Sequence, residues 1–250
     1  MSKGAREASA RERIAAQRAA SRKQDQRRRL MIITAVGAVA VAAIGLGSWY
    51  AASRNAAEKP VLAQAPATVN ADGTLTLGKP GVTGPVVEVY EDFQCPACKA
   101  LEDSSGSTIK NLAAEGKAKV IYHPITIFPQ EPTRSNSIRA ASAARCITDG
   151  RQWLAFHDKL FQNQPGETVE GFALNDLVSW GEDVGVTAPG FPECVTSQKY
   201  AQAQANQSAK VLKNDKLTGT PTIRVNGKDL PNQTAYVPAK LREAVLAAGR

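Results

Sequence analysis

Two cysteines placed three residues apart, Cys95 and Cys98, have the type and spacing in this 250-residue chain that most clearly suggest chemistry. They lie in the segment EDFQCPACKALE, where an apolar, β-branched run gives way to a stretch with the composition of a helix. Three kinds of site use such a pair: a zinc site, a structural disulfide and a reactive dithiol. The rest of the sequence supports these three kinds of site to different degrees.

The zinc interpretation needs four ligands, which commonly come as two close pairs. The other two cysteines, Cys146 and Cys194, are 48 residues apart, and the chain contains two histidines, His123 and His157. This ligand set disfavours zinc, and no metal or organic cofactor is expected. A structural disulfide within the CxxC pair is also disfavoured, because closing so short a loop restrains the unfolded chain least.

A reactive dithiol has a positive physical argument. If a helix begins at Cys95, the sulfur faces unpaired backbone N–H groups and the positive end of the helix dipole, which favour thiolate over thiol. Such surroundings lower a cysteine pKa from about 8.5 by roughly one to several units. Cys98 lies one turn deeper on the same face and can attack a mixed disulfide formed at Cys95. The motif therefore predicts a nucleophile and a resolving cysteine.

The elements that must position this pair follow an α/β order. The patterns predict an edge strand at 74–77, further strands within 84–93 and 117–128, a helix over 95–116, a hairpin within 218–230 that turns at Asn226-Gly227, and a closing helix over 238–249. Residues 133–213 contain alanine-rich, helix-period segments and little that suggests strand. The predicted fold class is an α/β sheet interrupted by a helical insertion.

These motifs carry a family resemblance. VVEVYEDFQCPACKALE, with TGTPTIRVNG over a hundred residues later, resembles the thioredoxin-fold thiol–disulfide oxidoreductases, and the helical block resembles their DsbA-like branch. The resemblance covers roughly residues 75–249. It implies that Cys95 is the nucleophile, that Cys98 is the resolving cysteine and that Pro221, preceded by Thr220, is a cis-proline facing the pair. A trans proline that starts an edge strand is the alternative.

One position departs from the family pattern. Many relatives have an acid six positions before the first active-site cysteine, as a buried proton acceptor, and that position here is Val89. Strand alternation places Glu91 on the same side as Val89 and Glu88 on the other. Glu91 is therefore the candidate for this role, and a solvated loop carboxylate is the alternative.

The N-terminal region predicts where the domain is located. Residues 1–29 contain ten Lys or Arg and three acids, so their net charge is +7, and the net charge of the whole chain is +8. The remainder of the chain is therefore nearly neutral, which argues against nucleic-acid binding by the main domain. Residues 30–52 contain no charged residue and are long enough to cross a bilayer. Trp49 and Tyr50 lie at the far end, where aromatic rings favour the membrane interface.

We therefore expect a basic cytoplasmic tail at 1–29, a transmembrane signal-anchor at 30–52 that contacts lipid, a linker at 53–73 and an extracytoplasmic domain at 74–250. A cleaved signal peptide is the alternative, and it leads to the same location for the domain. A buried core helix fits poorly beside so many arginines.

An extracytoplasmic location bears on the second cysteine pair. Cys146 and Cys194 both fall in the expected insertion, and actinobacterial DsbA-like proteins resemble this arrangement, with a second pair that bridges the helical block. The expectation is a structural disulfide, and two reduced buried thiols are the alternative. In the chain-entropy model, closing a loop of about 49 residues contributes roughly 4 kcal/mol.

The predicted function is an extracytoplasmic thiol–disulfide oxidoreductase that introduces disulfides into exported proteins with free thiols. The resemblance implies a quinone-linked membrane partner that reoxidises it. The reductase and isomerase directions stay open, and Pro96-Ala97 between the cysteines lacks the histidine of strong oxidants, so we expect an intermediate potential. A non-catalytic binding or chaperone module for exported chains is the alternative from another class.

Overall fold

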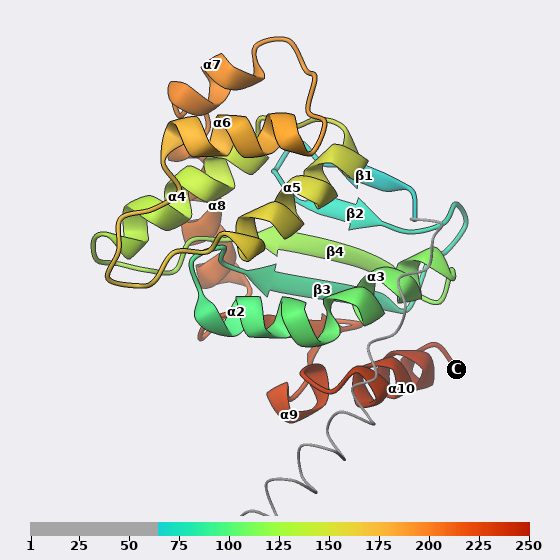
Figure 1. Cartoon of the computed structure of the whole chain (residues 1–250). Helices are drawn as coiled ribbons and strands as arrows, with labels where there is room; N and C mark the ends of the chain where they lie inside the picture. Colours follow the sequence, from blue (N-terminus) through green and yellow to red (C-terminus); the bar gives the residue numbers. More distant parts are fainter. Residues whose placement is uncertain (1–64) are drawn as a thin grey trace, which may run out of the picture. The chain divides into compact units, whose positions relative to one another are not determined.

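The computed structural model describes residues 65–250, which are shown coloured in Figure 1. The predicted tail at 1–29, the predicted anchor at 30–52 and the first part of the predicted linker lie outside the described residues. Within residues 65–250, the helices are all too short or too polar to cross a membrane.

A mixed sheet forms the centre of the described domain. Its strands are β1 (Ala67–Val69), β2 (Leu75–Leu77), β3 (Val86–Glu91), β4 (Lys119–Pro124), β5 (Thr222–Val225) and β6 (Lys228–Asp229). Their order in the sheet is β1-β2-β4-β3-β5-β6, with β3 and β4 parallel and the other pairs antiparallel. The two parallel strands occupy the middle, and in register they place Val89 opposite Tyr122. Both of these side chains are buried, so the central strands anchor the core.

Strand β1 corrects two expectations from the sequence. It lies inside the stretch 53–73 that was predicted to be linker, and Ala67 pairs with Leu77 of β2. Strand β2 is therefore not at the edge of the sheet. Three residues of alternating exposure are too short a pattern to stand out from a linker. Gly150 permits this arrangement, because a side chain there would collide with the carbonyl group of Ala67.

The predicted helix over 95–116 is divided in the structure. It consists of α2 (Pro96–Leu101), a π-helical turn η1 (Glu102–Gly106) and α3 (Ser107–Ala114). Gly106 accommodates the turn, because a side chain at this position would overlap the carboxylate of Glu102. Helix α3 packs on β4, and α10 (Pro238–Ala248) packs on α3 after the short helix α9 (Asn232–Ala235).

The predicted helical insertion is present between β4 and β5. Its helices are α4 (Thr133–Ala144), α5 (Gly150–Gln162), α6 (Leu174–Asp183), α7 (Phe191–Thr196) and α8 (Ala201–Asn214). Figure 1 shows α4, α6, α7 and α8 gathered beyond one end of the sheet, with α5 beside the strands. Cys146, just after α4, and Cys194, in α7, are joined by a disulfide. The insertion shares one hydrophobic core with the sheet, to which Trp153 and Phe156 contribute fully buried rings.

Turn chemistry explains two further features. Asp149 caps α5, and its carboxylate accepts hydrogen bonds from the backbone N–H groups of Arg151 and Gln152. The β5–β6 hairpin turns at Asn226 and Gly227, which both have positive φ, as its Asn-Gly sequence predicts. This hairpin brings the segment that contains Pro221 beside β3.

Candidate active site

Cys95 is the N-cap residue of α2, with Pro96 in the first helical position. Its backbone is extended, at φ −79° and ψ 117°, and the sulfur therefore lies at the helix N-terminus as the sequence predicts. A hydrogen bond from the Cys98 thiol is the main cause that lowers the pKa of Cys95 to about 6. Burial opposes this shift, whereas Thr220 and the backbone N–H groups of Cys98 and Ala97 reinforce it. Cys95 is therefore mostly thiolate at neutral pH.

Cys98 has the opposite character. Its side chain is 2% exposed, and the backbone N–H of Asp92 donates to its sulfur across 3.4 Å. Burial raises the pKa of Cys98 well above its usual value, and the neighbouring Cys95 acts in the same direction. One sulfur is thus a ready nucleophile, and the other holds its proton.

The segment around Pro221 faces this pair from the start of β5, the strand next to β3. The sulfur of Cys95 lies 3.4 Å from the carbonyl oxygen of Thr220, to which it donates when it is protonated, although the two residues are 125 positions apart. The Thr220–Pro221 peptide bond is cis, so the alternative of a trans proline is wrong. A groove of about 290 Å³ borders the segment, lined by residues 218–222 and 229–232. The structure therefore brings together Cys95, Cys98, Thr220 and Pro221 as predicted, whereas their catalytic roles stay predictions.

Asp92 is a site residue that the sequence reasoning missed. It is 0% exposed, and its carboxylate accepts hydrogen bonds from the backbone N–H groups of Gln94 and Ile127 and from the Ser137 hydroxyl. Burial raises the pKa of Asp92 to about 7, these hydrogen bonds partly offset the shift, and the charge on Cys95 adds to it. The signal that marks it is an acid directly after the end of β3, three positions before the first cysteine.

Glu91 lies on the same face of β3 as Val89, as strand alternation predicts. It is 3% exposed, so the alternative of a solvated carboxylate is wrong. Burial raises its pKa, and His157, whose Nε2 lies 2.8 Å from Glu91 Oε1, offsets part of the shift. The carboxylate therefore pairs with the helical insertion, and its role as a proton acceptor for Cys98 stays a prediction.

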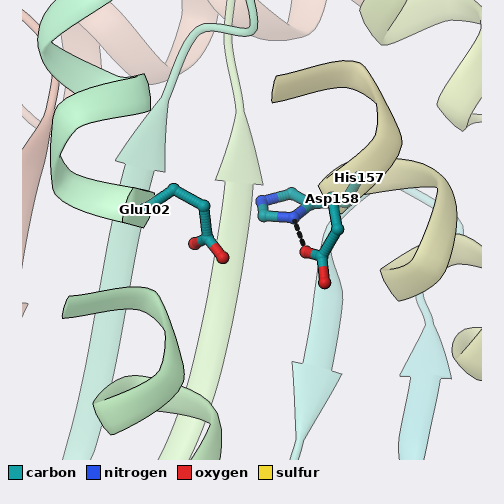
Figure 2. A group of neighbouring side chains, drawn as sticks. All are labelled: Glu102, His157 and Asp158. Atoms are coloured by element: carbon teal, nitrogen blue, oxygen red, sulfur yellow. Dashed lines mark hydrogen bonds and ion pairs between the residues drawn. The ribbon is translucent and has the colours of Figure 1, made fainter. Parts of the chain in front are cut away.

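His157 belongs to a buried ionic network, part of which is drawn in Figure 2. Ligand atoms of Glu102, His157 and Asp158 lie within 4.8 Å of one another, a spacing that could suit a cation. The Lys110 ammonium, however, lies 2.6 Å from carboxylate oxygens of both Glu102 and Asp158. Burial alone would lower the pKa of His157, but Glu91 and Asp158 outweigh it and raise the pKa to about 10. Two protein cations thus already balance these acids, and the set does not suit a metal.

The fold and the site define a thioredoxin-fold protein with a reactive dithiol. Residues 70–245 match the family described as Thioredoxin, and the chain belongs to this family. The DsbA-like class recognised from the sequence is confirmed by structures that share the fold.

Similar solved structures are thiol–disulfide oxidoreductases of the DsbA and DsbG type. Oxidised DsbA of Mycobacterium tuberculosis is 29% identical, with a TM-score of 0.58 over 73% of this chain and 92% of that one. Reduced DsbG of the same organism is 29% identical, with a TM-score of 0.59 over 78% and 91%. MdbA of Actinomyces oris, 24% identical with a TM-score of 0.59 over 72% and 90%, shares the fold.

Curated sequences give a more distant comparison. A candidate protein-disulfide oxidoreductase of Rickettsia bellii is 24% identical over 147 residues, which are 59% of this chain and 55% of the relative. The chain thus spans about half the length of the curated relatives it matches.

Proposed function

We propose that this protein is a thiol–disulfide oxidoreductase that introduces disulfides into exported proteins. The observation that carries the proposal is the contrast between Cys95 and Cys98. The pKa of Cys95 is lowered to about 6, whereas that of Cys98 is raised well above its usual value. Thiol–disulfide exchange needs one sulfur that reacts and leaves readily as thiolate and a second that completes the exchange.

The reaction proceeds in two exchanges. A substrate thiolate attacks Cys95 Sγ of the oxidised enzyme, the Cys95–Cys98 bond breaks, and a substrate–Cys95 disulfide forms. Cys98 leaves as thiolate and takes up a proton, because its pKa lies above neutral. A second substrate thiolate then attacks the substrate sulfur and expels Cys95, which stays ionised at neutral pH because its pKa is about 6. The substrate has lost two electrons, and the enzyme leaves as the dithiol.

The oxidising direction follows from the same electrostatics. Interactions that stabilise the Cys95 thiolate exist only in the reduced enzyme, so they favour reduction of the enzyme and oxidation of the substrate. The pKa of Cys95, about 6, is lowered less than the pKa of the corresponding cysteine in the strongest oxidant of this type, which is about 3.5. We therefore expect a potential between about −120 mV, as for DsbA, and about −270 mV, as for thioredoxin.

Location and partners form part of the proposal. The basic segment 1–29 followed by the uncharged segment 30–52 supports a single-pass anchor with the catalytic domain outside the cytoplasm. The Cys146–Cys194 disulfide suits an oxidising compartment. In such a location the dithiol needs an electron acceptor, and a quinone-linked membrane protein would regenerate the disulfide.

The test uses the purified full-length chain with a reduced, unfolded substrate protein. We expect the wild type, oxidised beforehand, to form substrate disulfides, Cys95→Ser to be inactive, and Cys98→Ser, with oxidised glutathione as the oxidant, to accumulate a mixed disulfide with substrate. Full activity of Cys95→Ser would overturn the assignment of Cys95, and a wild type that binds the substrate without oxidising it would favour the binding module. Equilibration with glutathione buffers then gives the potential, and a value near that of thioredoxin would reverse the direction to reductase.

A further inference from the structure

Gln164, just beyond the end of α5, contacts the active-site segment directly. Its side-chain Nε2 donates hydrogen bonds to the backbone carbonyl oxygens of Phe93, at 2.8 Å, and of Cys95, at 3.0 Å. Both acceptors are carbonyl oxygens, so the nitrogen of the amide must face them. One side chain from the insertion thus binds the backbone on both sides of Gln94.

A second glutamine makes the reciprocal contact. The Nε2 of Gln94 donates to the carbonyl oxygen of Pro165 at 2.9 Å, and Gln94 itself is 0% exposed. The two residues therefore join the segment before α2 to the segment after α5 with three hydrogen bonds. We call this arrangement the glutamine clamp, defined by Gln94 and Gln164.

The clamp acts where α2 lacks other support. Within the described residues, no side chain caps the N-terminus of α2, and its first residue is a proline. Backbone N–H groups that a polar side chain would normally bind are thus left to the Cys95 sulfur. The backbone of Cys95 must then be held from outside the helix, and the Gln164 amide holds it at the carbonyl group.

The same amide also has an electrostatic effect. The Cys95 carbonyl already accepts from the N–H of Lys99 at 3.1 Å, and Gln164 adds a second donor. Donors at this carbonyl offset its partial negative charge close to the thiolate. Loss of the amide would remove both this positive dipole and the restraint on the sulfur, and both changes disfavour the thiolate.

We propose that Gln164 is a positioning residue for Cys95, by which the helical insertion sets the reactivity of the nucleophile. It touches neither substrate nor sulfur in this role and acts through the backbone of residues 93–95. The inference rests on the proposed function, because it concerns how readily the same dithiol reacts. It assigns the insertion a part in the chemistry in addition to its part in the core.

The test compares two Gln164 variants with a matched control in the full-length chain. Gln164→Met keeps the length of the side chain and removes the donor, and Gln164→Glu places an anionic acceptor against two carbonyl oxygens. Gln152 is the control, because it lies on α5, the helix that leads to Gln164, and its side chain donates to a distant loop carbonyl, that of Gly185, at 2.8 Å. For each variant, ultraviolet thiolate absorbance gives the pKa of Cys95, alkylation gives its reactivity, and thermal unfolding reports the fold.

Removing a hydrogen bond of this kind changes an equilibrium by roughly threefold to tenfold. We therefore expect the Cys95 pKa to rise by about half a unit to one unit in Gln164→Met and by more in Gln164→Glu, while Gln152→Met stays at the wild-type value. The glutathione equilibrium should shift toward the oxidised enzyme in the same order. At pH values low enough to protonate the new carboxyl group, Gln164→Glu should move back toward wild type, because the neutral acid has an O–H that can donate to one of the two carbonyl oxygens.

Folded Gln164 variants with a wild-type Cys95 pKa and potential would overturn the inference, even if their thermal stability fell. An equal shift in Gln152→Met would also overturn it, because the effect would then belong to α5 in general. If a Gln164→Met sample is unfolded, Gln164→Glu at neutral pH decides by the same criterion. Failure of wild type to oxidise a substrate would instead count against the proposed function.

Discussion

The backbone N–H of Asp92 donates to the sulfur of Cys98 across 3.4 Å, while the carboxylate of the same residue is fully buried among three other donors. Asp92 therefore connects the resolving cysteine, the end of β3 and α4, which supplies Ser137. The neighbouring Glu91 points to the opposite face and pairs with His157 of α5. Two adjacent acids thus anchor the active-site segment to two different helices of the insertion.

The first prediction concerns the pH dependence of stability at Asp92. Its pKa is raised from 3.8 to about 7 by burial. A raised pKa means that the folded protein holds the proton more tightly, so this contribution is complete below about pH 4 and is lost as the pH rises through 7. A shift of about three units corresponds to a loss on the order of 4 kcal/mol.

Asp92→Asn removes the ionisation and keeps one acceptor. In urea unfolding of the reduced proteins, we expect wild type to lose stability between about pH 4 and about pH 8 and the variant not to show this loss. The unfolding free energy of the variant should therefore increase relative to that of wild type as the pH rises. The variant also loses an acceptor, which lowers its stability at acidic pH by about 1 to 3 kcal/mol. Parallel pH profiles for wild type and variant would show that Asp92 does not titrate in this range.

These acids also show what the sequence could and could not predict. Local patterns predicted three features that the structure contains: the helix start at the CPAC motif, the cis-proline in the TGTP segment and the helical insertion. The partner of a buried carboxylate is not a local property. Alternation predicted the face of Glu91, but His157 lies 66 residues away and reaches it only after α5 has packed beside the sheet.

Short or irregular elements were missed for a related reason. Strand β1 has three residues, and its pairing with β2 stabilises it more than its own sequence does. In the π-helical turn, the Glu102 carboxylate occupies the space that a side chain on residue 106 would need, and it forms an ion pair with Lys110. Both features depend on tertiary contacts, which periodicity does not encode.

The second prediction concerns the pH dependence of the dithiol. Cys95 has a pKa of about 6, and Cys98 keeps its proton well above neutral. Reduction of the disulfide therefore takes up two protons below about pH 6 and one proton above it. The midpoint potential should fall by about 59 mV per pH unit in the acidic range and by about 30 mV per unit above it.

Alkylation of the reduced enzyme should show the same pKa, because only the thiolate reacts. The rate should rise with pH and level off above about pH 7. Cys98→Ala should shift this midpoint upward, because it removes the hydrogen bond from the Cys98 thiol, which is the main cause of the low pKa. A midpoint near 8.5 in wild type would contradict the assignment of Cys95 as a stabilised thiolate.

The third prediction concerns the disulfide in the insertion. Cys146→Ala with Cys194→Ala removes a link that closes a loop of about 49 residues, and we expect the unfolding free energy to fall by roughly 4 kcal/mol in the chain-entropy model. Both cysteines lie in the insertion, away from the CxxC motif in sequence. The pKa of Cys95 should therefore stay at the wild-type value. A large change in that pKa would indicate that the disulfide acts on the active site as well as on stability.

The fourth prediction concerns the buried pair of His157 and Glu91. The pKa of His157 is raised to about 10, so its charge is retained in the folded protein, and its contribution to stability is complete below about pH 6.5 and is lost as the pH rises through 10. His157→Leu leaves Glu91 without its partner in a site that is 3% exposed. We expect a loss of about 3 to 5 kcal/mol in urea unfolding at neutral pH.

The double variant His157→Leu with Glu91→Leu separates the two causes of this loss. Replacing both members of a buried pair by apolar residues is often neutral or stabilising, so the double variant should recover most of the stability of the single variant. If the double variant is as unstable as His157→Leu, the cost lies in packing against Phe93, Phe161 and Trp153, whose rings surround the imidazole, and not in an unpaired charge. The recovery therefore measures how much of the attachment between β3 and α5 is electrostatic.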